Sequence, residues 1–256
     1  MTFTVATWNI NSVRLREPIV TRLMGEEAPD ILCLQECKCL AEQIPTEAFE
    51  ALGYRWRVAR GQKSYNGVAI LSKLPMVEAG GHDFADLGHA RHVAGQLENG
   101  VAIHNFYVPA GGDIPDRAEN VKFGQKLDFL THMRDWFHRE KLKRSILVGD
   151  LNIAPREDDV WNHKALLKIV SHTPVEVEHL GAAQEAGGWV DVTRNDIPEG
   201  LLYSWWSYRS PDWDAADKGR RLDHVWATPD IAGAGHGSRI LRAARGWLRQ
   251  ALDPLS

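Results

Sequence analysis

The 256-residue sequence has few cysteines, no long hydrophobic run and no surplus of positive charge. Cys33, Cys37 and Cys39 are odd in number and crowded together, which favours reduced thiols over a disulfide framework. No Cys/His group with zinc spacing accompanies them, so a soft metal site is the less favoured interpretation. No stretch approaches ~18 uninterrupted apolar residues, and no basic segment followed by an apolar one opens the sequence. We therefore expect a cytoplasmic protein with neither a membrane span nor a signal peptide.

The net charge of −4 disfavours a protein that coats DNA, because nonspecific affinity comes from Lys and Arg that neutralise phosphates. An enzyme needs only a local basic face, and the sequence contains two basic groups near its C-terminal end. Their members are Arg209, Lys218, Arg220 and Arg221, then Arg239, Arg242, Arg245 and Arg249. An ordinary solvated surface explains either group equally well.

Apolar runs alternate with helix-period segments along the chain, and no repeat or linker divides it. The runs typical of strands are 5–10, 31–34, 68–71, 101–108, 146–148 and 222–227. Apolar residues at helical spacing form two faces, namely Leu15, Ile19, Val20, Leu23 and Met24, and then Phe123, Leu127, Leu130 and Phe137. Strands interspersed with helices indicate the α/β class. With 44% hydrophobic residues and ten Trp, residues 1–256 are expected to form one large domain.

Polar residues with catalytic potential follow three of these apolar runs. Glu36 follows 31–34, Tyr107 lies near the end of 101–108, and Asp150 and Asn152 follow 146–148. Buried strands provide rigid backbone, so side chains at their ends can meet at one edge of the sheets although they are far apart in sequence. The pattern predicts a site assembled from strand ends.

Such residue types fit the hydrolysis of a phosphodiester, which requires a stabilised dianionic transition state, a positioned water and a stabilised alkoxide. A hard divalent cation does the first and the last, and it prefers carboxylate oxygens. Glu36 is the best ligand candidate, because a carboxylate directly after a buried strand is costly unless its charge is compensated. Asn11 is assigned as a second candidate ligand. Without the other motifs, a surface glutamate at a strand end would be the preferred interpretation of Glu36.

The segment Gly149-Asp150-Leu151-Asn152 carries the strongest single signal. Glycine permits a close approach of backbone to substrate, and residues two apart in an extended chain point the same way. We therefore expect Asp150 to orient and deprotonate the attacking water, while the amide of Asn152 donates to a nonbridging phosphate oxygen. An Asx turn that closes a strand is the structural alternative.

Asn9 and Tyr107 offer neutral donors that do not repel a phosphate. Tyr107 could also stabilise developing negative charge, as a phenol or as a phenolate. Considered alone, it is better explained as a core tyrosine whose hydroxyl bonds to backbone. Asp223, in Arg221-Leu222-Asp223-His224, is expected to orient a catalytic imidazole.

The segment from Tyr203 to Arg209 is dense in aromatic side chains. Neighbours in a strand face opposite sides, so one indole of Trp205 and Trp206 can pack inward while the other stacks on a base or fills an abasic gap. Such pairs are equally often plain core. Their nearness to the cluster from Lys218 to Arg221 favours nucleic acid, with Arg209 and Arg221 as candidate DNA-binding arginines.

Taken in order, these motifs resemble those of the exonuclease III family, within the endonuclease/exonuclease/phosphatase superfamily. The segments that carry the resemblance are Thr7-Trp8-Asn9-Ile10-Asn11, Leu34-Gln35-Glu36, Asn105-Phe106-Tyr107-Val108-Pro109, Gly149-Asp150-Leu151-Asn152, Tyr203 to Arg209 and Arg221-Leu222-Asp223. The resemblance runs from about Thr4 to Trp247. Each motif is weak by itself, but the ordered set is highly specific.

The resemblance implies a Mg²⁺- or Mn²⁺-dependent DNA repair nuclease with 3′→5′ exonuclease, abasic-site endonuclease and 3′-phosphatase activities. Its partner would be double-stranded DNA at abasic sites and 3′ ends, and it would act as a monomer. The implied fold is a four-layered, two-sheet α/β sandwich flanked by helices. The implied roles are Glu36 as metal ligand, Asn9, Asp150 and Asn152 around the phosphate and water, Tyr107 as active-site phenol, Asp223 as orienter of the histidine, and Trp205 and Trp206 as aromatics on the DNA side.

The C-terminal end departs from the family pattern, in which a Ser-Asp-His segment introduces the last strand. There the Asp contributes to the metal site and the His contacts the scissile phosphate. Here the sequence runs on from Trp247 to Ser256 without such a segment, and Asp253 in Leu-Asp-Pro does not match. His224 would point to the opposite strand face from Asp223, so it is not expected to substitute. We expect the C-terminal strand to be missing or altered, through a frameshift or a natural truncation, with impaired activity.

Two other functions stay open. A phosphoesterase for lipid or inositol phosphates would share the fold, but the Trp205-Trp206 pair with its basic neighbours argues against it. A catalytically inactive DNA-binding relative fits the absent histidine. Against it speaks the retention of the other site residues, namely Glu36, Asp150, Asn152 and Asp223.

Overall fold

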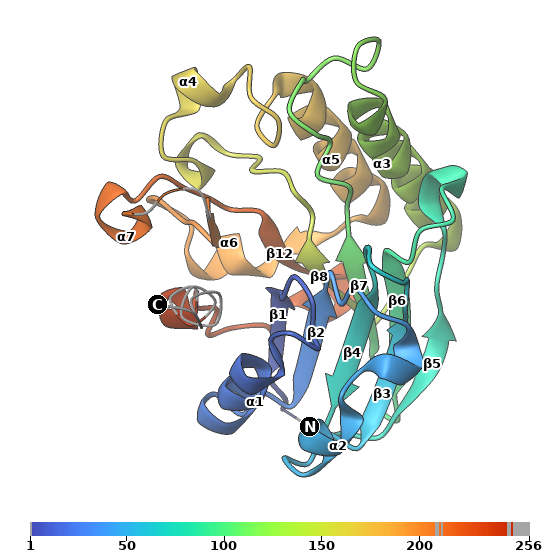
Figure 1. Cartoon of the computed structure of the whole chain (residues 1–256). Helices are drawn as coiled ribbons and strands as arrows, with labels where there is room; N and C mark the ends of the chain where they lie inside the picture. Colours follow the sequence, from blue (N-terminus) through green and yellow to red (C-terminus); the bar gives the residue numbers. More distant parts are fainter. Residues whose placement is uncertain (1, 208–209, 211, 245–246, 248–256) are drawn as a thin grey trace. The chain divides into compact units, whose positions relative to one another are not determined.

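The computed structural model describes residues 2–207, 210, 212–244 and 247, and its internal contacts divide the chain into two compact units. The first unit contains the residues up to Tyr107, the segment Ile146–Asp150 and the residues from Leu241 on. The second contains Val108–Ser145 and Leu151–Ile240. Figure 1 labels most of the elements of both units. Within this described part of the chain, no helix combines the length and the apolar character needed to cross a membrane.

The first unit contains two β-sheets, and their most buried strands coincide with the apolar runs of the sequence. One sheet has the order β1-β2-β4-β3, in which only β1 and β2 are parallel. Its strands are β1 (Val5–Asn9), β2 (Ile31–Gln35), β3 (Trp56–Arg60) and β4 (Val68–Ser72). The other has the order β5-β6-β7-β8, with strands β5 (Met76–Gly80), β6 (His92–Leu97), β7 (Ala102–Tyr107) and β8 (Ser145–Asp150). β2 and β4 are buried at every position, as their uninterrupted hydrophobic sequences predict.

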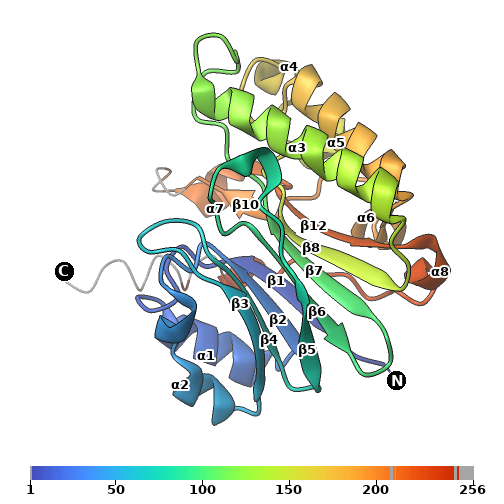
Figure 2. The same ribbon diagram turned by 90° about the vertical axis from the view of Figure 1, so that its right-hand side faces the viewer.

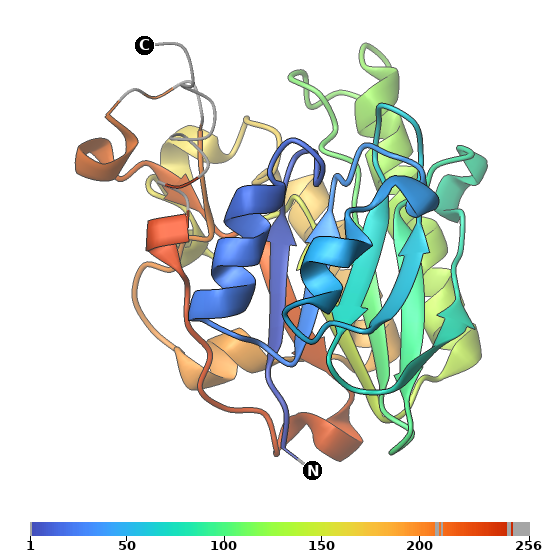
Figure 3. The ribbon, with the colours of Figure 1, turned by 60° about the horizontal axis from the view of Figure 1, so that its bottom comes forward.

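Helices α1 (Glu17–Glu26) and α2 (Thr46–Glu50) cover one face of the β1-β2-β4-β3 sheet (Figures 1 and 3). The predicted apolar stripe of α1 packs on this sheet through Ile19, Val20, Leu23 and Met24. Leu15 was assigned to the same face and this is wrong, because it precedes the helix and is 61% exposed. The proline in the first turn fixes the backbone for a helix start at Glu17, after Leu15.

Buried side-chain amides join the two sheets of the first unit. Asn105 Nδ2 donates to the backbone oxygens of Leu34 at 3.0 Å and Ala69 at 2.9 Å, and Gln35 Nε2 donates to Asn105 Oδ1 at 2.6 Å. These bonds run from β7 to β2 and β4, so the sheets face one another. The predicted two-sheet α/β arrangement flanked by helices is confirmed. The predicted change of the last strand falls on residues 248–256, which lie outside the described part of the chain.

The second unit is built on two long helices, α3 (Val121–Glu140) and α5 (Pro174–Gly187), which lie side by side in Figure 2. Asn120 caps α3, and Phe123, Leu127, Leu130 and Phe137 are buried on it, as predicted. The short helices of this unit are α4 (His163–Leu166), α6 (Val192–Asp196), α7 (Trp213–Ala216) and α8 (Pro229–Ala232). Its strands are β9 (Val190–Asp191), β10 (Trp205–Trp206), β11 (Gly219–Arg220) and β12 (Asp223–Ala227), paired as β12 with β9 and β10 with β11. Single 3₁₀ turns occupy Ala41–Gln43, Phe84–Asp86 and Glu157–Asp159.

The β6-β7 pair of the first unit contains two stacked, buried histidines. The ring planes of His92 and His104 differ by 4°, and Nε2 of His92 lies 3.2 Å from Nδ1 of His104. Burial, and then the neighbouring His82, lower the pKa of His104 to about 4. Burial also lowers the pKa of His92, so the pair is neutral in the folded protein at neutral pH.

We expect this neutral pair to make the protein less stable as the pH falls from about 6.5 to about 4. In this window the unfolded chain binds a proton at His104 that the folded chain does not, so each pH unit lowers the free energy of unfolding by up to about 1.4 kcal/mol. Below about pH 4 both states carry the proton on His104, and the part of the loss that comes from His104 levels off. Urea unfolding across this window should show a smaller pH slope for His104→Gln than for the unmodified protein. Equal slopes would contradict the assignment.

Candidate active site

Four predicted site residues of the first unit meet at the ends of strands. Asn9 ends β1, Glu36 follows β2, Tyr107 ends β7 and Asp150 ends β8. Asn9 Nδ2 donates to Glu36 Oε1 and to Asp150 Oδ2, both at 2.9 Å, so a neutral amide bridges the two carboxylates. The Tyr107 hydroxyl donates to Glu36 Oε1 at 2.7 Å. Glu36, Tyr107 and Asp150 thus lie in one cluster, as their positions after apolar runs predicted, whereas their catalytic roles stay a prediction.

The loops that carry these side chains use an uncommon backbone conformation. Asn11, Glu36 and Lys38 have φ values of +50°, +52° and +54°, in the left-handed region that favours glycine. Backbone bonds hold the two loops together, with Ser12 N donating to Glu36 O at 2.7 Å. Residues held in sparsely populated conformations collect at functional sites, where surrounding structure fixes them. Here the turn aims the Glu36 carboxylate at Asn9 and Tyr107.

Electrostatics make Glu36 an ionised acid and Tyr107 a protonated phenol. Burial raises the pKa of Glu36, but hydrogen bonds from Asn9, Tyr107 and Lys38 outweigh it and the pKa lies below its usual value. Burial, and then the charges of Glu36 and Asp150, hold the pKa of Tyr107 well above its usual value. Of the two forms considered for Tyr107, the structure therefore has the phenol, with its proton donated to Glu36.

Arg91 belongs to the same cluster and has no counterpart among the predicted site residues. Its guanidinium carbon lies 4.5 Å from the centre of the Tyr107 ring, and Nη1 donates to Tyr107 O at 3.2 Å. Burial lowers the Arg91 pKa, whereas Tyr107, Glu36 and Asp150 favour the charged form. The site thus holds a half-buried positive charge beside its two acids. No motif in the sequence marks this position.

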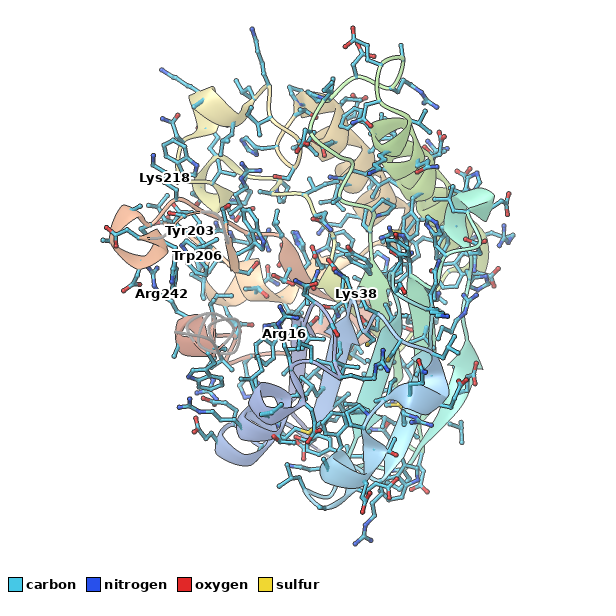
Figure 4. All side chains as sticks on the ribbon, viewed as in Figure 1. Arg16, Lys38, Tyr203, Trp206, Lys218 and Arg242 are labelled. Carbon is cyan, nitrogen blue, oxygen red and sulfur yellow. The ribbon has the colours of Figure 1, made fainter. Side chains whose placement is uncertain are left out.

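Lys38 is a second unpredicted cation, and its ammonium contacts both residues proposed as metal ligands. Its ammonium lies 2.9 Å from Glu36 Oε2 and 2.5 Å from Asn11 Oδ1 (Lys38 is labelled in Figure 4). The two oxygens assigned to a metal thus converge on one positive charge, and oxygen ligands suit a hard divalent cation. Arg16 supports the loop by donating to Asn11 O. Among the described residues, no cluster of three or more His, Cys, Asp or Glu side chains could hold a metal ion by itself.

Gly149 is in close contact with a neighbouring strand. Its φ is +142°, and a Cβ built on it would lie 1.9 Å from the backbone oxygen of Phe106 in β7. The glycine therefore permits close approach to that strand, while its predicted close approach to substrate stays a prediction. This contact also fixes the position of Asp150, which follows Gly149 at the end of β8.

Asn152, in the second unit, lies in an irregular segment just after β8. Its φ of +55° breaks the strand geometry on which the shared direction of Asp150 and Asn152 was based, so that argument is corrected. The side-chain Nδ2 donates to Val108 O at 2.9 Å. Its proposed contact with a phosphate stays a prediction.

Asp223 begins β12 and is tied to Ser204. Ser204 Oγ accepts from the backbone nitrogens of Leu222 at 3.0 Å and Asp223 at 2.9 Å. Burial raises the pKa of Asp223 to about 6, although a hydrogen bond from Ser204 opposes the rise. Its neighbour His224 is buried, its Nε2 lies 2.8 Å from Ile153 O, and burial lowers its pKa to about 3. His224 is buried and Asp223 is only half-buried, as the strand alternation predicted, and the expectation that His224 does not replace a catalytic imidazole stays a prediction.

Trp205 and Trp206 differ in burial, as expected for neighbours in a strand. Trp206 is buried, donates from Nε1 to Asp217 Oδ1 at 2.9 Å and packs edge to face against Trp213 (Trp206 is labelled in Figure 4). Trp205 is half-buried, packs on a small apolar cluster and has the Arg220 guanidinium 5.6 Å from its ring centre. Trp205 is therefore the candidate for a DNA contact, which stays a prediction.

Arg221 was assigned to DNA, and the structure corrects this assignment. Its side chain is fully buried, with Nε 2.8 Å from Asp159 Oδ1 and Nη1 2.8 Å from Asp191 Oδ2. Asp159 also pairs with Arg194 at 2.6 Å, which makes a buried network of charges inside the second unit. A side chain enclosed in this way cannot reach a phosphate. Arg209, the other predicted DNA-binding arginine, lies outside the described residues.

Replacing Arg221 with methionine is expected to lower the free energy of unfolding by about 3 kcal/mol, because it leaves buried carboxylates with less compensation. DNA affinity of the folded protein should stay close to that of the unmodified protein. Urea denaturation and fluorescence anisotropy measure the two quantities, with the neighbouring, half-buried Arg220→Met as a matched variant. Unchanged stability together with weakened DNA binding would restore the original assignment.

Known proteins are similar to this chain in sequence and in fold. A profile of the Endonuclease/Exonuclease/phosphatase family matches residues 6–248. Exodeoxyribonuclease III of Haemophilus influenzae is 28% identical over 239 residues, covering 88% of each chain, and an exodeoxyribonuclease of Bacillus subtilis is 31% identical over 235 residues, covering 85% of each. An AP endonuclease from Archaeoglobus fulgidus has a TM-score of 0.83 at 31% identity, over 91% of this chain and 89% of that one. The 3′ phosphatase NExo from Neisseria, bound to a product DNA hairpin, has a TM-score of 0.81 at 29% identity with the same coverage.

The chain belongs to the Endonuclease/Exonuclease/phosphatase family. The relatives confirm the resemblance to exonuclease III that the ordered motifs indicated.

Proposed function

We propose that this chain is a DNA repair nuclease of the exonuclease III type, which hydrolyses phosphodiester bonds in double-stranded DNA. The observation that carries the proposal is the pair of carboxylates, Glu36 and Asp150, bridged by the Asn9 amide at 2.9 Å on both sides. The relatives named exodeoxyribonuclease and AP endonuclease support the substrate class. Mg²⁺ or Mn²⁺ is the proposed cofactor, and abasic sites and 3′ ends are the proposed positions of cleavage. A monomer acting in the cytoplasm is part of the same proposal.

Glu36 and Asn11 would hold the cation. A divalent cation bound there would polarise a phosphoryl oxygen and stabilise the departing alkoxide. The convergence of Glu36 Oε2 and Asn11 Oδ1 on the Lys38 ammonium supports this assignment. Lys38 is a long, partly exposed side chain, so it can withdraw toward solvent and leave both oxygens facing the cation.

Asp150 would orient the attacking water and accept its proton. The bond from Asn9 Nδ2 to Asp150 Oδ2 fixes the direction of this carboxylate. A general base must stay in hydrogen-bond reach of the proton it removes, and a held carboxylate meets that condition. Asn9 thereby sets the separation between the base and the Glu36 ligand.

Positively charged and hydrogen-bond-donating side chains would stabilise the remaining negative charge of the transition state. Arg91 is proposed to supply a positive charge beside Tyr107, Glu36 and Asp150. The Tyr107 phenol can turn its proton from Glu36 to an anionic oxygen, and Asn152 is proposed to donate its amide to a nonbridging oxygen. Asp223 is proposed to act as an orienting carboxylate, and Trp205 as a stacking surface for DNA.

Incubation with a duplex oligonucleotide that contains one abasic-site analogue tests the function. We expect strand cleavage at the analogue and shortening from 3′ ends in Mg²⁺, and neither in EDTA. Release of phosphate from inositol phosphates or phospholipids, without DNA cleavage, would overturn the substrate class. Tight duplex binding with no cleavage in Mg²⁺ or Mn²⁺ would identify a non-catalytic relative instead.

Glu36→Gln is expected to raise the Mg²⁺ concentration for half-maximal cleavage by about tenfold or more, because one anionic ligand becomes neutral. The circular dichroism spectrum should be unchanged, since glutamine still accepts the bonds from Asn9 and Tyr107. Metal titrations of cleavage rate measure the effect. The exposed Glu26→Gln serves as control, and a titration curve for Glu36→Gln that matches the control would remove Glu36 from the metal site.

A further inference from the structure

A lysine and a glutamate form an ion pair in the interior of the second unit, and neither residue is among the predicted site residues. Lys126 Nζ of α3 lies 2.5 Å from Glu176 Oε1 of α5, and both side chains have no exposed surface. Burying two charges is expensive, and well-packed apolar residues of similar size are often as stabilising or more so. The pair therefore calls for an explanation other than stability.

The lysine ammonium meets three acceptors, which matches its three N–H groups. Besides Glu176 Oε1, Lys126 Nζ donates to Asn152 O at 2.8 Å and to Ala110 O at 3.2 Å. The charged donor thus ends on the backbone carbonyl of the residue proposed to contact the phosphate. A charge-assisted bond to this carbonyl is stronger than one between neutral groups.

Glu176 fixes the other side of the pair. Its carboxylate accepts from Ser171 N at 2.9 Å, from Thr173 Oγ1 at 2.7 Å and from Thr173 N at 3.2 Å, and so closes the N-terminal cap of α5. The backbone oxygen of Ser171 in turn accepts from Ala154 N at 2.8 Å. The same carboxylate therefore binds the lysine and Ser171, whose backbone oxygen accepts a hydrogen bond two residues after Asn152.

Each residue of the segment 151–154 has a backbone group that takes part in a hydrogen bond with another segment. Leu151 N donates to Leu222 O at 2.9 Å, Ile153 O lies 2.8 Å from His224 Nε2, and His172 Nδ1 lies 2.7 Å from Ala154 O. Lys126 supplies the corresponding bond at Asn152 O. This is the residue of the segment with the left-handed φ of +55°, so its carbonyl needs an external donor to stay in that orientation.

We propose that Lys126 is a positioning residue, which aims the Asn152 amide by holding the Asn152 carbonyl, with Glu176 keeping the ammonium in place. The inference rests on the proposed role of Asn152 in phosphate recognition. The Asn152 carbonyl and side chain share one Cα, so a shift of that Cα after loss of the Lys126 bond would move the side-chain amide, which donates to Val108 O at 2.9 Å. Displacement of a catalytic group by about 1 Å is enough to cost on the order of a hundredfold in rate.

The test uses the double variant Lys126→Met/Glu176→Gln. Methionine removes the ammonium while keeping the length of the side chain, and glutamine still accepts from Ser171 N and Thr173 N without leaving a buried charge. We expect kcat for abasic-duplex cleavage to fall on the order of a hundredfold, KM to change by less than about threefold, and the melting temperature to stay within a few degrees. A matched control is Arg117→Met/Asp128→Asn, which removes an exposed ion pair of the same unit.

A double-mutant comparison separates positioning from general damage. Asn152→Ala should lower kcat by a similar factor, and adding it to Lys126→Met/Glu176→Gln should cause little further loss, because both act through one amide. Losses that multiply, or a double variant with kcat within threefold of the unmodified protein, would overturn the proposal.

The positioning role can also be tested by a measurement that does not depend on DNA cleavage. The ¹⁵N side-chain amide resonance of Asn152, assigned by its disappearance in Asn152→Ala, should move in Lys126→Met/Glu176→Gln and stay in place in the Arg117/Asp128 control. An unmoved resonance rules out the positioning role whether or not the unmodified protein cleaves DNA. A moved resonance in a protein that cleaves no DNA would keep the structural link and refute the nuclease function.

Discussion

Asp150→Asn is expected to lower kcat for Mg²⁺-dependent cleavage of an abasic duplex by about 10²–10⁴-fold, the usual contribution of a general base. Asparagine has the same shape, and its side-chain oxygen can still accept the 2.9 Å bond from Asn9 Nδ2. It cannot take a proton from water at neutral pH. The loss should therefore appear in kcat under saturating DNA, with little change in thermal stability.

Asp128→Asn is the matched control, because it neutralises an exposed carboxylate on α3 whose partner is Arg117. Its cleavage rate should equal that of the unmodified protein. Single-turnover kinetics would keep product release from hiding the effect. If Asp150→Asn retained more than about a tenth of the normal single-turnover rate, another group would have to be the base.

Gly149→Ala is expected to lower the free energy of unfolding by about 5 kcal/mol or more, in the range reserved for severe structural conflicts. The added methyl group would lie 1.9 Å from Phe106 O and 3.0 Å from Phe106 N, which are backbone atoms that cannot rotate away. Either β7 and β8 separate or the residue leaves its φ of +142°. Both responses also move Asp150, which is next in the chain. Urea denaturation of both proteins gives the difference.

Gly80→Ala separates collision from backbone strain. Gly80 has a φ of +112°, but a Cβ there meets nothing within 4 Å. Its replacement should cost only the strain of the conformation, about 1–3 kcal/mol. Equal losses for the two variants would mean that the close approach of β8 to β7 contributes nothing beyond the dihedral angle.

The apolar runs gave the buried strands because a strand covered on both faces has no polar positions to interrupt it. β2 and β4 are of this kind, and the predicted runs fall on them. β5 is exposed at all positions but its first, and β3 is mostly half-buried with a single buried position, so neither has the continuous apolar run that predicts a strand. β6 was missed as well, because its sequence from His92 to Leu97 includes a buried histidine and a glycine that no strand pattern favours.

The site was predictable where residues follow identified strands, and not where they depend on partners remote in sequence. Glu36, Tyr107 and Asp150 stand at the ends of runs 31–34, 101–108 and 146–148, and they meet. Arg91 precedes β6, a strand that the sequence did not reveal. Arg221 looked like a surface cation because Asp159 and Asp191, which enclose it, stand 62 and 30 residues earlier.

The left-handed turns at Asn11, Glu36 and Lys38 bear on how the protein can evolve. An L residue in this conformation costs roughly 1–2 kcal/mol, whereas glycine adopts it freely. Mutation to glycine at any of the three positions therefore relieves strain and removes a side chain of the acid cluster in one step. A population screened for heat resistance without a requirement for DNA cleavage would drift toward glycine at these loops. Selection for cleavage would act against that drift at the positions that cleavage requires.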